Sequence, residues 1–339
     1  MANEQKLGRQ ALSIGDLSVK GRCILAPLSG VTDVAFRRIA MRFGAGLVIS
    51  EMVASDEFVG GSEEARLRAE GEGVSPHVIQ LAGCDPRWMA QASKLAEGSG
   101  AQIIDINMGC PAKRVTGGEA GSALMRDLDH AARLIAATVE AVSIPVTVKM
   151  RLGWDERSLN APDLARWAET LGVRAITVHG RTRQQFYKGS ADWIAIARTV
   201  DAVAVPVVAN GDIRSVQDAR RCLSQSRASA VMVGRAAMGR PWLVGQIAAA
   251  LADEPVREPT AAQKTEVGME HYEGLLSLYG REVGVRRARK HLAAYADTAR
   301  SAGYGLSAGE RLRLVTANDP ATVKDLLRRM YAIPLRDAA

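Results

Sequence analysis

The chain has 339 residues, 47% of them hydrophobic and 24% charged, a composition typical of a globular protein with one or two domains. Its formal net charge of +7 and isoelectric point of about 9.4 favour an anionic partner, nucleic acid being the leading candidate. The polar N-terminus excludes a signal peptide and no long apolar run is present, so we expect a cytoplasmic protein without a membrane span.

The first predicted elements form a hairpin within residues 11–21, where LSIGDLSVKG alternates around Gly15-Asp16 and closes the floor of a barrel. From residue 22 onward, short apolar runs alternate with amphipathic stretches. The predicted strands are residues 23–26, 47–49, 77–81, 103–106, 146–150, 175–178, 207–209 and 230–233. The helices predicted between them include 33–43, 86–98, 130–141, 162–171, 192–200 and 216–223.

This alternation predicts an α/β fold, a (β/α)8 TIM barrel within residues 1–250. The rival architecture is a doubly wound open sheet, but no G-x-G-x-x-G motif follows any of the strands. After Pro241 the strand-like runs stop, and helices are predicted at 260–280, 283–302, 307–316 and 320–330. A polar segment with two prolines at 253–259 marks a domain boundary, so we expect residues 259–339 to form a C-terminal helical bundle domain.

Polar residues follow the predicted strands at their carboxyl ends, where a barrel of this kind carries its chemistry. Lys149 interrupts an apolar strand and needs a partner there. The partner is either Glu51 or Asp105 in an internal salt bridge, or an anionic or electron-rich cofactor. His179 holds a matching position on the neighbouring strand, which favours the cofactor interpretation.

Two further strand ends predict a phosphate site. Asn210-Gly211-Asp212 and Gly234-Arg235 follow the last two strands and offer glycine amides and a guanidinium. A small phosphorylated cofactor therefore fits the mouth of the barrel.

The four cysteines show no C-x-x-C spacing, which argues against a zinc ribbon, and we expect no metal site. Cys23, Cys84 and Cys222 are expected to pack as small hydrophobic side chains. Cys110 differs because it lies between Gly109 and Pro111 directly after a predicted strand. Those two helix breakers predict a stiff turn that presents the thiol at the barrel mouth.

Eight motifs occur in order: APLSGVTD, SEMVAS, VIQLAG, DINMGCPA, VKMRLGW, VHGRTR, VVANGDI and VGRAAMGRPW. Together they resemble the tRNA-dihydrouridine synthases, flavin enzymes that reduce uridine in tRNA, and INMGCP is highly specific to that family. GRAAMGRPW and the later ARKH at residues 288–291 are similar to the B-type bacterial subfamily. The resemblance covers residues 12–300 and weakens beyond them.

The resemblance implies a barrel that holds FMN, NADPH as the reductant, and a helical C-terminal domain that grips tRNA. The implied flavin contacts are Pro27, Leu28 and Ser29 along its surface, Gln80, Lys149 and His179 at its ring system, and Asn210, Gly211, Asp212, Gly234 and Arg235 at its ribityl phosphate. Leu28 and Ser29 stand where the family usually has Met and Ala. Neither change threatens activity, because Leu for Met conserves apolar volume and the backbone still faces the flavin.

The resemblance also implies that Cys110 is the proton donor. Saturation of the uracil C5–C6 bond requires a hydride at C6, which the family takes from the reduced flavin, and a proton at C5 from the opposite face. A thiol of ordinary acidity is mostly protonated at neutral pH and can therefore donate.

A uridine inside folded tRNA must be pulled out of its stack, and phosphate contacts supply most of the affinity. We expect Arg286, Arg287 and Lys290 of the basic run at 286–291 to contact phosphates. The remaining candidates lie near the mouth and are either RNA guides or simple surface charge: Lys113, Arg114, Arg181 and Arg183. No obligate protein partner is evident.

Two alternatives stay open. A flavin dehydrogenase acting on free pyrimidines such as dihydroorotate would use the same barrel and the same bond, although a small substrate needs no basic helical domain. A non-catalytic tRNA-binding protein would keep that domain but would not need Cys110, Lys149 and His179 together.

Overall fold

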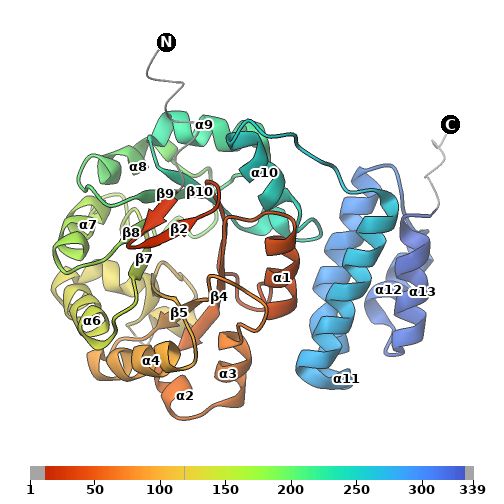
Figure 1. Ribbon diagram of the computed structural model, residues 1–339, viewed down its shortest axis with the longest axis horizontal. Helices are drawn as coiled ribbons and strands as arrows, with labels where there is room; N and C mark the ends of the chain where they lie inside the picture. The colour runs from red at the N-terminus through yellow and green to blue at the C-terminus, as the bar shows by residue number, and fades with distance from the viewer. Residues whose placement is uncertain (1–11, 118, 333–339) are drawn as a thin grey trace.

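The computed structural model describes residues 12–117 and 119–332, and shows a closed barrel with a helical domain attached to one side (Figure 1). Eight parallel strands form the barrel in the order β10-β3-β4-β5-β6-β7-β8-β9. Their bounds are β3 Cys23–Leu25, β4 Leu47–Ala54, β5 Val78–Ala82, β6 Ile103–Met108, β7 Val146–Arg151, β8 Ala175–His179, β9 Val207–Asn210 and β10 Ala230–Val233. The predicted TIM barrel is confirmed.

A hairpin plugs the amino-terminal end of the barrel. β1 (Leu12–Ile14) pairs antiparallel with β2 (Leu17–Val19), and Gly15 turns between them with φ of 58°. Leu12, Ile14 and Val19 are buried against side chains from the amino-terminal parts of the barrel strands. The predicted floor is therefore present, while the predicted start at residue 11 and the rest of residues 1–11 lie outside the described residues.

Helices cover the outside of the barrel and shield its strands. The ones predicted from the sequence are α1 Val34–Arg42, α4 Pro86–Gly98, α6 Leu128–Ala141, α7 Ala161–Thr170, α8 Trp193–Val200 and α9 Val216–Ser226. Most begin at an Asp or Ser whose side chain accepts an N–H of the first turn, as Asp33 does from Phe36 at 3.0 Å. Their apolar faces and the strands share one large core.

Several short elements were not predicted. They are α2 Ser55–Val59, α3 Glu63–Ala69, α5 Lys113–Thr116, α10 Leu243–Leu251 and the 3-10 turns η1 Gly121–Arg126 and η2 Arg235–Ala237. β4 also runs to Ala54, five residues beyond its predicted end, and carries Glu51 and Met52. Most of these additions lie in loops after the strands, where they shape the open end of the barrel.

The C-terminal helices build a second core. α11 (Ala261–Ser301) is interrupted at Gly280, whose φ of 72° and ψ of 165° are not helical, so it forms two arms as the sequence predicts. α12 (Ala308–Thr316) and α13 (Pro320–Met330) pack on these arms. Ile39 and Trp242 from the barrel side join the same apolar cluster, which attaches the helices to α1. In the described part of the chain, no helix has the length and apolar character needed to cross a bilayer.

Candidate active site

A cavity of about 800 Å³ opens at the carboxyl ends of the barrel strands, a volume within the usual range for ligand sites. Cys110 lines this cavity. So does each residue predicted to bind the cofactor: Pro27, Leu28, Ser29, Gln80, Lys149, His179, Asn210, Gly211, Asp212, Gly234 and Arg235. The predicted residues come from seven of the eight strands or from the loops that follow them, and they meet in one place although they span more than half of the sequence.

A chain of hydrogen bonds runs from the barrel interior to the cysteine turn. Gln80 donates to Asp105 at 2.7 Å and accepts from Asn107 Nδ2 at 2.8 Å. The Asn107 side-chain oxygen then accepts the backbone N–H groups of Gly109 at 3.2 Å and Cys110 at 3.0 Å. The conformation of the turn is therefore specified by side chains buried beneath it.

A second set of contacts holds the cysteine turn from above. The carbonyl of Cys110 accepts hydrogen bonds from the backbone N–H and the hydroxyl of Ser122 at 3.0 and 2.9 Å. Gly121 makes this approach possible, since its φ is +60° and a Cβ there would lie 2.8 Å from the Cys110 oxygen. Arg151 donates to Gly109 O at 2.8 Å and to Phe186 O at 2.8 Å, so it ties the turn to the loop after β8.

Lys149 lines the cavity without the salt bridge that was one of its two predicted roles. The Asp105 carboxylate is bound by Gln80 and Thr147, and Glu51 accepts the N–H of Gly30 instead. Burial, together with the nearby Arg151, lowers the pKa of Lys149 to about 8 against the opposing effect of Asp105. Lys149 therefore remains mostly protonated at neutral pH and offers its N–H donors to the cavity.

His179 is neutral and held in one tautomer. Burial and the positive charges of Lys149 and Arg151 lower its pKa well below the ordinary value. Its Nδ1 donates to the Asn210 side-chain oxygen at 2.7 Å, and Asn210 Nδ2 in turn donates to Met232 O at 2.8 Å. His179 Nε2 is then the acceptor, and it accepts from Arg181 Nη1 at 3.4 Å.

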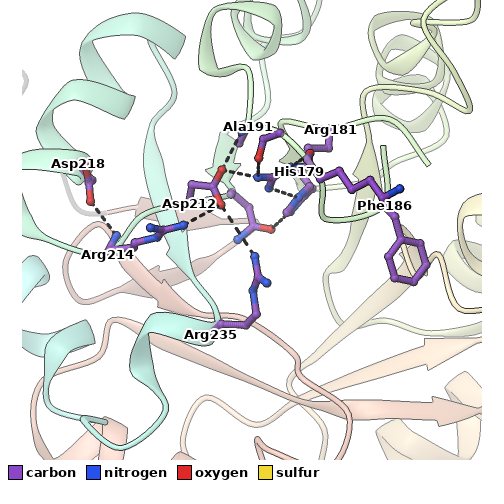
Figure 2. A network of polar contacts seen from close by, with 12 residues as sticks. His179, Arg181, Phe186, Ala191, Asp212, Arg214, Asp218 and Arg235 are labelled. Carbon is purple, nitrogen blue, oxygen red and sulfur yellow. Dashed lines mark hydrogen bonds and ion pairs between the residues drawn. The ribbon is translucent and has the colours of Figure 1, made fainter. Parts of the chain in front are cut away.

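Asp212 is the centre of a polar network at the other end of the cavity (Figure 2). Its Oδ2 accepts the backbone N–H of Ala191 at 2.8 Å and the guanidinium of Arg181. Its Oδ1 lies 3.9 Å from both Arg214 and Arg235 and has no hydrogen-bond partner among the described residues. Burial alone would raise the pKa of Asp212, but the Ala191 N–H and Arg181 outweigh it and the net pKa is lowered.

Some residues of the cavity were not assigned a role from the sequence. Asn107 and Arg151 stand at strand ends, a position that marks them as candidates. Arg214 and Arg240 also line the cavity, and Arg240 donates to the Arg214 carbonyl at 3.1 Å. Both belong to loops after the last strands, yet only the folded chain shows that their side chains reach the same wall as Arg235.

The residues predicted to bind RNA occupy different environments. Lys113 at the start of α5 and Arg286 are exposed, while the Arg114 side chain lies outside the described residues. Arg183 stacks over Trp154 at 4.8 Å. Arg181 is 1% exposed and bonds the carbonyls of Lys188 and Gly189 as well as Asp212, which gives it a positioning role.

The basic run on α11 is partly engaged with the barrel. Arg287 pairs with Glu64 at 3.1 Å and stacks on Tyr279 at 4.2 Å. Lys290 reaches Gly30, where a Cβ would lie 2.5 Å from its ammonium nitrogen. These side chains therefore join the two parts of the molecule in addition to presenting charge. Among the other cysteines, Cys23 and Cys222 are buried as predicted and Cys84 is half-buried.

Relatives in sequence cover nearly the whole chain. Residues 24–311 match the family model described as dihydrouridine synthase (Dus). A probable tRNA-dihydrouridine synthase from Rhizobium leguminosarum bv. phaseoli is 52% identical over 315 residues, which cover 93% of this chain and 96% of the relative. A tRNA-dihydrouridine synthase B from Xanthomonas axonopodis pv. citri is 47% identical over 287 residues, 84% of this chain and 86% of the relative.

Solved structures with low identity share the fold alone. Histamine dehydrogenase from Rhizobium sp. 4-9 superposes with a TM-score of 0.55 at 15% identity, covering 78% of this chain and 50% of that one. A 2-naphthoyl-CoA reductase gives a TM-score of 0.54 at 11% identity, with 73% and 53% covered, so this chain spans about half the length of both. From the family match, the identities and the ordered motifs, we conclude that the chain belongs to the dihydrouridine synthase family.

Proposed function

We propose that this chain is a B-type tRNA-dihydrouridine synthase that reduces specific uridines in tRNA with FMN and NADPH, and that Cys110 is its proton donor. The observation that carries the proposal is the single cavity in which Cys110, Lys149 and His179 meet an arginine-lined wall. The curated relatives named for this activity, 52% and 47% identical, support the same reaction.

The residues of the cavity fit FMN. Pro27, Leu28 and Met232 give it apolar lining, which suits a flat ring system. The unpartnered Asp212 Oδ1 is a suitable acceptor for ribityl hydroxyl groups, and the exposed guanidinium groups of Arg214 and Arg235 beside it suit a phosphate. When bound, the reduced flavin supplies a hydride to the pyrimidine ring.

The chain's own side chains prepare the proton transfer. Cys110 Sγ carries the proton for C5, and the Asn107 and Ser122 contacts hold its backbone so that the thiol keeps one position at the cavity wall. The protonated Lys149 would donate hydrogen bonds to polar groups of the bound ring systems, and the neutral His179 would line the same side of the cavity. A fixed donor of this kind acts by proximity, so small displacements of the turn should reduce the rate strongly.

The rim of the cavity suits an extruded base. Phe186 and Tyr187 are 40% and 47% exposed and both line the opening. Arg151 and Arg235 lie 5.6 and 5.0 Å from the centre of the Tyr187 ring. Exposed aromatic rings backed by cations are typical of sites that stack nucleic-acid bases, and the exposed Lys113 extends the same rim.

The test compares Cys110→Ala with Cys84→Ala, a half-buried cysteine outside the lining of the cavity. Both proteins should bind FMN and unmodified tRNA, but only Cys110→Ala should lose most of its dihydrouridine formation with NADPH. Dihydrouridine is measured by mass spectrometry of the digested tRNA. Normal turnover in Cys110→Ala would contradict the assigned proton donor.

A second measurement separates the reaction from its alternatives. Protein reduced by NADPH should be reoxidised by unmodified tRNA and not by orotate. Reoxidation by orotate instead would identify an enzyme of free pyrimidines. Binding of tRNA by a protein that takes up no flavin would identify a non-catalytic tRNA-binding protein.

A further inference from the structure

Three buried side chains meet where the barrel contacts the C-terminal helices, away from the cavity. Asp33, His271 and His291 are 3%, 0% and 2% exposed. One potential ligand atom from each lies within 4.8 Å of the other two. The Asp33 Oδ2 atom is 3.3 Å from His271 Nε2 and 4.0 Å from His291 Nε2. All three side chains therefore direct polar atoms at one small volume.

The three residues come from three different segments. Asp33 is the N-cap of α1 on the barrel, His271 lies in the first arm of α11, and His291 lies in the second arm. The break at Gly280 brings the two arms together, and the His271 and His291 ring centres are 4.5 Å apart. Anything bound among them would connect the barrel and both arms at once.

Hydrogen bonds within the protein leave this cluster incomplete. Asp33 Oδ1 accepts the Phe36 N–H, and Asp33 Oδ2 and His271 Nε2 form a hydrogen bond at 3.3 Å. His271 Nδ1 is 3.1 Å from the Tyr295 hydroxyl, so His291 is the member without a partner among the described residues. Neither ring nitrogen of His291 makes a hydrogen bond of normal geometry with a described residue, although the backbone of Gly30 is close enough to raise its pKa. Leaving such a buried polar group unpaired is unfavourable, so a missing partner is expected.

The neighbouring groups do not fill this gap. The Arg37 guanidinium donates to the carbonyls of Thr32 and Glu70. The Phe36 ring packs 5.3 Å from the His271 ring and 6.1 Å from the His291 ring, which closes the cluster with an apolar wall. Burial lowers the pKa of His291 to about 3, so the ring is neutral, the form in which imidazole coordinates metals.

The ligand set and spacing suit a transition metal. Two imidazole nitrogens and one carboxylate oxygen are common ligands of Zn²⁺, with bonds of about 2.0–2.2 Å that place the ligand atoms of a tetrahedral site about 3.3–3.5 Å apart. The observed 3.3 Å separation already fits, and small side-chain rotations bring the 4.0 Å separation into range. The Tyr295 hydroxyl at His271 Nδ1 is the kind of outer contact that fixes a ligating histidine.

We propose that Asp33, His271 and His291 bind one zinc ion that clips the barrel to both arms of α11. No sequence motif marks this site, because its ligands are far apart in the chain and none belongs to a C-x-x-C or H-x-x-H pattern. The ion has a structural role, and this inference does not depend on the proposed tRNA reaction. Removing the ion should loosen the helical domain and leave the barrel folded.

The first experiment measures zinc in the full-length protein. The wild-type chain is loaded with zinc sulfate, desalted and analysed by elemental mass spectrometry, with about one zinc per chain expected. Asp33→Asn keeps an oxygen for the Phe36 N–H and so preserves the cap of α1, but it should lose most of the zinc, as should His291→Ala. His130→Ala serves as the control because His130 lies on α6, outside the cluster, and its zinc content should equal that of wild type.

Thermal unfolding gives an independent readout. A chelator should lower the melting temperature of the wild-type protein by several degrees and added zinc should restore it, whereas Asp33→Asn should respond to neither. The proposal is overturned if the loaded wild-type protein holds no zinc above background, a result that does not depend on how the variants fold. It is equally overturned if Asp33→Asn and His291→Ala retain as much zinc as His130→Ala.

Discussion

The side-chain oxygen of Asn107 accepts the backbone N–H of Cys110 at 3.0 Å, so a residue buried in the barrel determines where the thiol lies. Asn107→Ala removes this acceptor and leaves two buried N–H groups unpaired, at a cost of about 1–3 kcal/mol each. We expect at least a tenfold lower single-turnover rate with tRNA and retained flavin. Asn160→Ala removes a hydrogen bond from a side-chain amide to the Met125 carbonyl, outside the cavity, and should keep the wild-type single-turnover rate. Equal rates for the two variants would show that the Asn107 contact is unimportant.

Gly121→Ala tests the same turn from the opposite side. The new Cβ would lie 2.8 Å from the Cys110 carbonyl oxygen at a backbone φ of +60°, so the turn must shift. Gly100→Ala is the matched control, because Gly100 also has positive φ, +90°, and has no atom within 4 Å of its Cβ position. Both variants should lose stability in chemical denaturation, but only Gly121→Ala should also lose most of its dihydrouridine formation.

Asp212→Asn should weaken flavin binding and the loop that supports it. The substitution removes the negative charge facing the buried Arg181; because Asp212 is only partly buried and Arg181 keeps its bonds to two carbonyls, we expect a cost of about 1–3 kcal/mol. Asp201→Asn, which removes an exposed pair with Arg227, should cost less than about 1 kcal/mol. Flavin release is followed by fluorescence and stability by urea unfolding. Unchanged flavin affinity in Asp212→Asn would contradict the fit of the cavity to FMN.

Lys149 should make the stability of the flavin-free protein depend on pH. Its pKa of about 8 in the folded chain is below its ordinary 10.5, so between these values the unfolded chain binds more protons and the native state gains stability as pH rises. From about pH 8 to about pH 10, the free energy of unfolding of the wild type should increase by about 1–2 kcal/mol relative to Lys149→Met. Lys94→Met, at an exposed helical lysine, should follow the wild type. If the free energies of unfolding of the wild type and Lys149→Met change with pH in the same way, the pKa of Lys149 is not lowered in the folded chain.

The salt dependence of tRNA binding should distinguish the exposed basic residues of α11 from those that contact other side chains of the protein. Arg286→Ala should weaken tRNA binding and reduce the slope of log K against log salt by about 0.9, the value for one phosphate contact. Arg287→Ala should also lower stability, because it breaks the contacts with Glu64 and Tyr279. Filter binding at several salt concentrations measures the slopes. An unchanged slope for Arg286→Ala would place tRNA elsewhere.

The spacing of apolar residues predicted the strands and helices of the barrel, because this spacing depends only on residues that are close in the sequence. The ends of parallel strands must then meet at one face, which is why Gln80, Lys149 and His179 could be grouped without coordinates. The interruption of α11 at Gly280 could be predicted for the same reason, since it separates two segments that each have helical spacing of apolar residues.

Contacts between distant residues could not be read from the sequence. From the sequence, Lys149 could form either a salt bridge or a cofactor contact. The structure speaks against the salt bridge with Asp105, because Gln80 and Thr147 bind that carboxylate instead. Arg181 was predicted to be either an RNA guide or a surface charge, but the chain folds it onto Asp212, 31 residues away. The short helices after β4 and β6 span only four to seven residues, too few turns for a periodic signal to mark them.

The hairpin at the base of the barrel also constrains the order of events. Leu12, Ile14 and Val19 fill that end with apolar side chains. A ligand of the cavity must therefore enter and leave through the rim near Tyr187. Under the proposed function, the nicotinamide of NADPH and the target base of tRNA would both use this opening. The proposed reaction would then have two separate halves, in which NADPH leaves before tRNA enters and the reducing equivalents stay on the bound flavin.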